Sequence, residues 1–392
     1  MSPVQVFIST GEVSGDLQGA LLVTALQHQA AAQGLNLEII ALGGDRMAAA
    51  GAHLLANTIS IGAMGVVESL PFLLPTWRAQ QQAKHQLLAN PPAVLVLIDY
   101  FGPNLALGRY VRRRFPQLPI VYYIAPQMWV WNPWPGQTRQ LVQMTDRLLA
   151  IFPGEARYFE AQGVAVDWVG HPLIDRVKKA PSRAEARRRW GLSATTPVIA
   201  LFPASRRQEL HYLLPAIFTA AQRLQAERPA VQFLVSLSLA RYREAVVQAI
   251  ADYGLQATLV EDEALAVMAA ADLAITKSGT VNLEMALLNL PQVVLYRVNP
   301  LTMWLARRLY HFDIPHISPP NLVLEAGLIP ELLQEAATPE RIVAEARSLL
   351  DDADRRQALL DGYARLRGRL GEPGVCDRAA QAILTLATSS NA

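Results

Sequence analysis

Val121-Tyr-Tyr-Ile-Ala-Pro-Gln-Met-Trp-Val-Trp131 is a short apolar run that leads into a loop rich in aromatic residues and proline. Three other segments share this design, in which an apolar run ends in small, polar or charged residues: Val4–Asp16, Ile199–Arg207 and Ala274–Glu284. In a parallel sheet, ligands bind just beyond the carboxyl ends of the strands. Four such strand ends in one chain predict an enzyme with a large substrate.

Short apolar runs alternate with segments of helical periodicity along the whole chain. Strands separated by helices form βαβ units, so we expect parallel sheets covered by helices on both faces. The expected strands fall into two series. The first comprises residues 4–9, 37–42, 93–98, 119–124, 147–152 and 165–169, and the second comprises 197–202, 231–236, 257–260, 272–276 and 292–296.

The chain has 392 residues, more than one hydrophobic core usually serves, so two domains are expected. The charged, proline-marked segment 178–190 separates the two strand series and is the predicted boundary. We therefore predict an α/β fold with two Rossmann-like parallel-sheet domains that face each other across a cleft. The domains are residues 1–177 and 190–365, and a C-terminal helix within 366–392 packs back on an N-terminal domain.

Composition narrows the class of protein. No run approaches the roughly 20 apolar residues that cross a bilayer, and residues 1–9 lack a basic leader, so secretion is not expected. The single Cys376 can form neither an internal disulfide nor a metal cluster, which fits a reducing cytoplasm. Net charge is only +2, which gives no reason to expect nucleic acid. With 52% hydrophobic residues and local arginine clusters, the chain resembles proteins that work at a membrane surface.

The segment Ser9-Thr-Gly-Glu-Val-Ser-Gly-Asp16 is expected to join the first strand to a helix that starts near Leu17. Its glycines would let the backbone approach a ligand, and a helix N-terminus offers free N–H groups. The alternative is an ordinary turn in which Ser14 or Asp16 caps the helix.

Asp99 follows the apolar run 93–98, so its carboxylate should lie at the carboxyl edge of a buried strand. A partly desolvated carboxylate there could take the proton of a sugar hydroxyl as a general base. It could instead cap a helix that begins near Asn104.

Two apolar segments allow a membrane or lipid role. Trp129, Trp131 and Trp134 lie in a loop, because neighbouring prolines bar a regular helix. Their rings could stack on sugars, lie at a lipid–water interface or fill a local hydrophobic cluster. The stretch Met64–Trp77 is too short and too broken to span a membrane. It could dip into one, form a slot for acyl chains or be an ordinary core helix.

The second half contains two candidate phosphate sites. Arg206 follows a buried strand, where its guanidinium could meet a pyrophosphate. The Ser278-Gly-Thr280 turn offers hydroxyls and N–H groups to phosphate, and Glu284 could hold ribose hydroxyls one turn later. The alternatives are solvated arginines and a capped helix with a surface glutamate. His171 is interpreted as structural, and Asp352-Ala-Asp354 as solvated charge.

Taken in order, these motifs resemble the lipid-A-disaccharide synthase family, bacterial glycosyltransferases of the GT-B fold. The resemblance runs from Phe7 to about residue 388. Its motifs are Gly11–Asp16, Met64–Glu68, Tyr122–Trp131, Val169–Pro172, Pro203–Arg206, Ser278–Glu284, Tyr296–Val298, Thr302–Arg308 and Ile317–Asn321.

The resemblance implies a reaction of lipid A biosynthesis, which serves the lipopolysaccharide of the Gram-negative cell envelope. UDP-2,3-diacylglucosamine would react with 2,3-diacylglucosamine-1-phosphate (lipid X) to give a β(1→6) disaccharide and UDP. The acceptor 6-hydroxyl would displace UDP in one inverting step with Asp99 as base and without a metal or other cofactor. Arg206 would offset charge on the leaving UDP. The donor-site residues would be Ser278, Gly279, Thr280, Glu284 and Asn321.

For the first domain, the resemblance implies an acceptor loop with Glu12, Ser14, Gly15, Asp16, Gln127 and Trp129. Acyl-chain or membrane contacts would involve Met64, Val67, Phe72, Leu73 and Trp77, and arginines near Arg112 would meet anionic lipid. The protein would be cytoplasmic and peripheral on the inner face of the inner membrane. Its partners would be the two lipid substrates and a second copy, in a homodimer with exchanged C-terminal domains; nucleic acid would not be a partner.

Three positions depart from the family's pattern. Tyr100-Phe-Gly-Pro-Asn104 stands where the family has Ala-Pro-Asp-Phe-Asn, so Gly102 takes the place of an aspartate and its carboxylate is absent. Leu322-Val-Leu-Glu-Ala-Gly327 replaces Leu-Leu-Ala-Gly-Arg-Glu, and Lys277 replaces a small residue. Two alternatives therefore stay open: a paralogous GT-B enzyme on another UDP-sugar, such as an epimerase relative, or a catalytically silent lipid-binding paralogue.

Overall fold

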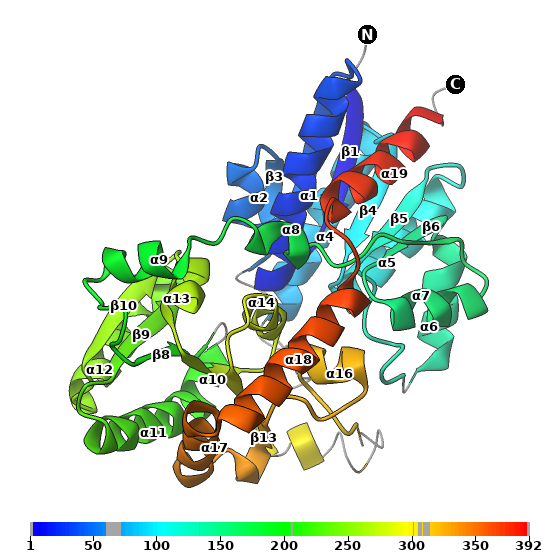
Figure 1. The fold of residues 1–392 in the computed structure, drawn as a ribbon. Helices are drawn as coiled ribbons and strands as arrows, with labels where there is room; N and C mark the ends of the chain where they lie inside the picture. The colour runs from blue at the N-terminus through cyan, green and yellow to red at the C-terminus, as the bar shows by residue number, and fades with distance from the viewer. Residues whose placement is uncertain are drawn as a thin grey trace. The chain divides into compact units, whose positions relative to one another are not determined.

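The computed structural model describes residues 3–59, 72–132, 134–204, 207–300, 302–304, 308 and 314–389. The chain divides into two compact units (Figure 1). The first unit comprises residues 1–175 and 370–392, and the second comprises residues 176–369. The charged segment 178–190 thus lies inside the second unit, where Arg183–Arg189 form helix α9.

The first unit is built on a parallel sheet of order β3-β2-β1-β4-β5-β6-β7. β3 and β7 are short, half-exposed edge strands. β3 was not predicted, because its sequence contains no long apolar run. The strands are β1 (Val4–Ser9), β2 (Leu37–Gly43), β3 (His53–Asn57), β4 (Val94–Ile98), β5 (Ile120–Tyr123), β6 (Arg147–Ala150) and β7 (Val166–Trp168).

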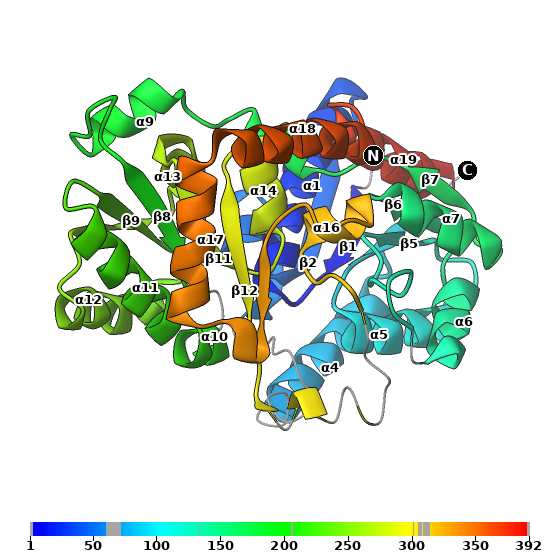
Figure 2. The ribbon, with the colours of Figure 1, turned by 60° about the horizontal axis from the view of Figure 1, so that its bottom comes forward.

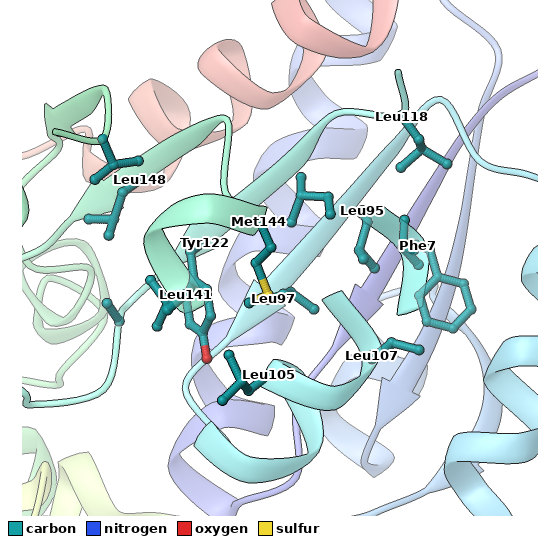
Figure 3. Close-up of a cluster of buried hydrophobic side chains, with 14 of the residues drawn as sticks. Phe7, Leu95, Leu97, Leu105, Leu107, Leu118, Tyr122, Leu141, Met144 and Leu148 are labelled. Atoms are coloured by element: carbon teal, nitrogen blue, oxygen red, sulfur yellow. The ribbon is translucent and has the colours of Figure 1, made fainter. Parts of the chain in front are cut away.

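Helices cover both faces of this sheet. Figure 3 shows part of the core on one face, where the Tyr122 ring of β5 packs among leucines of β4 and α5 and Met144 of α6. On the other face, α19 lies beside α1 (Figure 1). The described helices are α1 (Val13–Ala32), α2 (Asp45–Ala49), α4 (Leu73–Ala89), α5 (Phe101–Arg114), α6 (Pro135–Met144), α7 (Pro153–Ala161), α8 (Leu173–Val177) and α19 (Val375–Ser389).

The second unit repeats the design with the parallel order β10-β9-β8-β11-β12-β13. β13 has only three residues and was not predicted. The other strands match the second predicted series to within one residue at each end. They are β8 (Val198–Phe202), β9 (Gln232–Leu237), β10 (Ala257–Glu261), β11 (Leu273–Lys277), β12 (Gln292–Tyr296) and β13 (Glu331–Leu333).

Helix α17 lies along β11 and β12 in the second unit (Figure 2). On α9, Ala186 is buried in a core cluster with side chains of α13 and β8. The described helices are α9, α10 (Arg207–Tyr212), α11 (Leu214–Glu227), α12 (Arg243–Asp252), α13 (Ala264–Ala270), α14 (Val281–Leu287), α16 (Pro319–Leu324), α17 (Pro339–Asp351) and α18 (Ala353–Leu370), with short 3₁₀ helices at Ala240–Tyr242 and Gln334–Ala336.

Each sheet has one point where the strand order reverses. It lies between β1 and β4 in the first unit and between β8 and β11 in the second. In doubly wound sheets, ligands bind outside the carboxyl ends of the strands at this switch point. Each unit therefore has a candidate binding region of its own, in the loops after β1 and β4 in the first unit and after β8 and β11 in the second. The two parallel sheets confirm the predicted α/β fold class, and no helix among the described residues is long and apolar enough to cross a bilayer.

Candidate functional site

Asp99 lies directly after β4, at the switch point of the first sheet. Its backbone has φ 45°, and those of Tyr100 and Ile124 have φ 47° and 61°. Residues other than glycine seldom adopt this left-handed region, and such strain concentrates at functional sites. Helix α5 begins at Phe101 with Tyr100 in the N-cap position. The predicted alternative, in which Asp99 caps a helix near Asn104, is therefore wrong.

The peptide groups on both sides of Asp99 are held by hydrogen bonds. The Asp99 N–H donates to the Ile124 carbonyl at 3.0 Å. The Asp99 carbonyl accepts from the Tyr122 hydroxyl at 2.8 Å and from the Asn104 amide at 2.8 Å. The side chain of Asp99 is half-buried. The strained backbone is thus fixed from three directions.

Asn104 is a positioning residue that the sequence did not reveal. It is fully buried, and its Nδ2 also donates to the Ser9 and Ile98 carbonyls at 3.2 and 3.1 Å. Its Oδ1 accepts from the Ser9 hydroxyl at 2.7 Å. Asn104 therefore joins the ends of β1 and β4, the two strands that flank the switch point.

The loop after β1 is shorter than predicted. Helix α1 begins at Val13 rather than near Leu17, and Glu12 occupies its N-cap position, so Ser14 and Gly15 lie in the first turn. Asp16 does not cap this helix. Its carboxylate accepts from three backbone N–H groups at the start of α2, those of Gly44, Arg46 and Met47, at 2.9, 3.2 and 3.1 Å. Burial raises the pKa of Asp16, and these donors partly offset the rise.

The glycines of this loop make room for side chains of the same unit. A Cβ on Gly11 would lie 2.3 Å from the Tyr100 ring, and one on Gly15 would lie 2.0 Å from the Thr10 hydroxyl. The Tyr100 ring therefore rests on the loop at Gly11. Tyr100 belongs to the segment 100–104 that departs from the family's pattern.

The aromatic loop after β5 contributes to a local ring cluster. Trp129 packs against Phe152 with ring centroids 5.7 Å apart, and Phe152 packs against His171 at 5.1 Å. Gln127 is exposed. His171 is buried and accepts from the Leu173 N–H at Nδ1. Burial lowers the pKa of His171 to about 3, so the ring is neutral at pH 7.

Glu155 is a buried carboxylate at the same sheet edge, and sequence reasoning missed it. Three backbone N–H groups donate to it, from Ala125, Ile151 and Phe152. Burial raises the pKa of Glu155 to about 7, the three donors lower it in part, and the Asp99 charge raises it further. The signal in the sequence was its position three residues after Phe152 at a helix start, which is capping-box spacing.

Helix α4 exposes apolar side chains on its first turns. Leu73, Leu74 and Trp77 are 61%, 56% and 58% exposed, while Phe72 is half-buried. Exposed apolar residues that cluster on one face mark interaction sites. Met64 and Val67, also predicted for this role, lie outside the described residues.

In the second unit, the turn after β11 carries Lys277. Its ammonium lies 4.0 Å from Glu209 and would lie 3.0 Å from a Cβ on Gly279. The lysine thus folds against the Ser278–Thr280 turn. The Ser278 hydroxyl donates to the Ile317 carbonyl at 3.2 Å, and Thr280 precedes α14 as its N-cap. Arg206 lies outside the described residues.

Glu284 and Asn321 are both buried. Glu284 forms an ion pair with Arg176, so it is not the surface glutamate of the alternative interpretation. The Asn321 amide makes four hydrogen bonds, donating to Ile329 and Glu331 and accepting from the N–H groups of Leu328 and Ile329. Its hydrogen-bonding capacity is used within the unit, so Asn321 holds the loop after α16 in shape.

Glu331 was not predicted either. It also accepts from the Ile317 and Ser318 N–H groups at 2.9 Å, at the turn that leads into α16. Among the residues that the structure describes, no three His, Cys, Asp or Glu side chains meet as a metal site would need. Asp352 and Asp354 are exposed, as predicted.

Solved structures define the class of protein to which this fold belongs. Staphylococcus aureus MnaA with UDP has a TM-score of 0.68 at 17% identity, over 97% of each chain. UDP-GlcNAc 2-epimerase from Neisseria meningitidis has 0.68 at 12%, over 98% of this chain and all of that one. MurG of Acinetobacter baumannii has 0.56 at 17%, with the same coverage. The fold is that of the GT-B class.

Within that class, sequence similarity gives the family. The chain belongs to the lipid-A-disaccharide synthetase family, whose model matches residues 6–386. Relatives named lipid-A-disaccharide synthase include those of Synechocystis sp., 56% identical over 98% of each chain, and Gloeothece citriformis, 55% identical over 97% of this chain and 99% of the relative. The relative from Prochlorococcus marinus is 49% identical over 98% and 99%. These identities favour the main prediction over an epimerase relative.

Proposed function

We propose that the chain joins UDP-2,3-diacylglucosamine to lipid X, forming the lipid A disaccharide-1-phosphate and UDP. The observation that carries this proposal is similarity at 49–56% identity, over nearly the full chain, to relatives named for this synthesis. The position of Asp99 at a switch point supports it, because acids at this edge can reach a bound substrate.

Asp99 is proposed as the general base of one displacement. Its carboxylate takes the proton of the acceptor 6-hydroxyl while that oxygen attacks the anomeric carbon of the donor. The bond from that carbon to the UDP oxygen breaks, and the leaving group departs with its electron pair. Attack from the opposite side inverts the configuration at the carbon.

The loops after β8 and β11 are proposed to hold UDP. Arg206 and Lys277 would face the pyrophosphate, where fixed positive charge stabilises the leaving group. Ser278, Gly279 and Thr280 would supply hydroxyl and backbone donors, and Glu284 would accept from ribose hydroxyls. Lys277 replaces a small residue of the family pattern, so it adds a cation beside this turn.

The acceptor side and the membrane face belong to the first unit in this proposal. The residues that would border lipid X are Glu12, Ser14, Gly15, Asp16, Gln127 and Trp129. The segment Met64–Trp77 would contact acyl chains at the inner face of the inner membrane. Arg113 and Arg114 are exposed and suit anionic lipid. Arg112 is instead bonded to Asp146 and to the Met144 and Pro116 carbonyls. The family resemblance also implies a homodimer with exchanged C-terminal domains and transfer without metal.

One assay tests the proposal. Purified protein is incubated with both diacylated substrates in detergent, with and without EDTA, and UDP and disaccharide are quantified by mass spectrometry. We expect EDTA-resistant disaccharide synthesis that Asp99→Asn nearly abolishes. Turnover of unacylated UDP-sugars alone would favour another GT-B activity, and tight lipid binding without turnover would favour the silent paralogue. Undiminished synthesis by Asp99→Asn would remove Asp99 as the base.

A further inference from the structure

Glu155 joins two loops at the edge of the first sheet that contains Asp99. One carboxylate oxygen accepts from the Ala125 N–H at 2.8 Å, in the loop after β5. The other accepts from the N–H groups of Ile151 and Phe152 at 2.8 and 3.2 Å, in the loop after β6. The side chain is 1% exposed, so water does not compete for these donors. No step of the proposed reaction uses this acid.

The loop after β5 leads from Glu155 to Asp99. Ile124 precedes Ala125 and has the left-handed φ of 61°, which is strained for a β-branched residue. Its carbonyl accepts the Asp99 N–H at 3.0 Å, and its own N–H donates to the Leu149 carbonyl at 3.3 Å. Strained backbone persists only where its surroundings fix it. The bond from Glu155 to the next N–H is one of those constraints.

We propose that Glu155 is a positioning residue for glycosyl transfer, which holds the Ile124–Ala125 backbone and thereby fixes Asp99 at the end of β4. This inference rests on the proposed function, in which Asp99 is the base. The negative charge of Asp99 also contributes to the raised pKa of Glu155, after the larger effect of burial. Tyr122 and Asn104 hold the carbonyl of Asp99. Its N–H is held through Glu155, because the Ile124 carbonyl that accepts this N–H belongs to the same peptide group as the Ala125 N–H that donates to Glu155.

Glu155→Gln tests this link with little change in volume. The amide replaces one acceptor oxygen by an NH₂ group, which cannot accept from the backbone donors. We expect kcat to fall about 10-fold or more, because small displacements of a catalytic group are costly. KM for both substrates should change less than about 2-fold, since ground-state binding is kept. Glu160→Gln, an exposed position on the same helix, is the control and should behave as wild type.

A second measurement is independent of turnover. Hydrogen exchange by mass spectrometry should show faster exchange in peptides that cover Asp99 and Ile124 in Glu155→Gln, by about 10-fold, whereas β8 should exchange as in wild type. If Glu155→Gln does not fold, Glu155→Asp provides the same two readouts. Its shorter acid keeps the charge but cannot reach both loops.

The outcomes separate the two proposals. An inactive wild-type protein would refute the proposed function, yet faster exchange at Asp99 would still support the link. A folded Glu155 variant with wild-type kcat and unchanged exchange at Asp99 would overturn the positioning role. A raised KM with unchanged kcat would also overturn it, because it would place Glu155 in substrate binding.

Discussion

At the scale of single residues, the end of β4 depends on buried polar side chains that satisfy one another. The side chain of Asn104 is buried and makes hydrogen bonds with Ser9, Ile98 and Asp99. Removing one partner of a buried hydrogen bond leaves the other unsatisfied, at a cost of about 1–3 kcal/mol. The same contacts that stabilise the unit therefore shape the proposed catalytic centre.

Asn104→Leu should lower both stability and activity. We expect the free energy of unfolding of the first unit to fall by about 2–4 kcal/mol, because several buried groups lose their partner. Urea unfolding followed by tryptophan fluorescence measures this loss, and kcat should fall with it. Gly102→Ala on the same helix is the control, since its Cβ would meet nothing within 4 Å. An Asn104→Leu protein with wild-type stability would contradict the assigned contacts.

His171 predicts a pH dependence of stability. Burial lowers its pKa to about 3 from an ordinary value of 6.5. Between pH 6.5 and 3, His171 is protonated in the unfolded chain but not in the folded protein. The contribution of His171 to the free energy of unfolding is therefore present above pH 6.5 and is lost as the pH falls towards 3. The loss is on the order of a few kcal/mol.

His171→Asn should make this loss smaller, because Asn can still accept from Leu173 but does not titrate. Thermal unfolding of the wild type and the variant from pH 4 to pH 8 measures this loss of stability. Glu155 titrates in the opposite sense over part of this range, since its pKa is raised to about 7. Only the difference between wild type and variant therefore isolates His171. Parallel pH curves for the two proteins would show that the histidine is not buried as described.

At the scale of elements, α4 combines a packed face with an exposed apolar turn. Ala79, Ala83 and Leu87 are buried, whereas Leu73, Leu74 and Trp77 are exposed. Trp77→Ser should therefore weaken binding to anionic phospholipid vesicles by about 1–3 kcal/mol with little effect on folding. Leu88→Ser, at the other end of the helix and 45% exposed, is the matched control. Sedimentation with vesicles measures the binding. Equal binding by the wild type and Trp77→Ser would exclude this face of α4 as a membrane contact.

The elements also show which features of the fold and the candidate site could be predicted from the sequence. Buried central strands were predictable because their apolar runs are continuous, as in β4 and β8. The roles of Asn104, Glu155 and Glu331 were not, because each depends on backbone donors or acceptors brought together by other strands. The alternative in which Asp16 caps α1 is wrong for the same reason, because the backbone donors to Asp16 lie about 30 residues later in the chain, at Gly44, Arg46 and Met47.

At the scale of the whole molecule, the two parallel sheets follow the same order over six strands, and the first has a further edge strand, β7. In the proposed reaction, the first unit binds the acceptor and the second binds UDP. The division of the chain differs from the predicted boundary for a local reason. Segment 178–190 is charged enough to resemble a linker, but Arg187 is buried and bonds Ala270, Ser193 and Asp272. These bonds attach α9 to the second unit, so the division falls at Asp175 instead.

Because the first unit contains both ends of the chain, the second is an insertion within it. The Asp175 carboxylate accepts from the Gly374 and Cys376 N–H groups at 2.7 and 3.0 Å, which anchors the start of α19. The apolar side of α19 then covers α1 and β4. The sheet of the first unit is therefore completed only by residues from the far end of the chain, so without α19 apolar side chains of α1 and β4 would lose their cover. A chain truncated before residue 375 should consequently recruit chaperones to a surface that the full-length protein conceals.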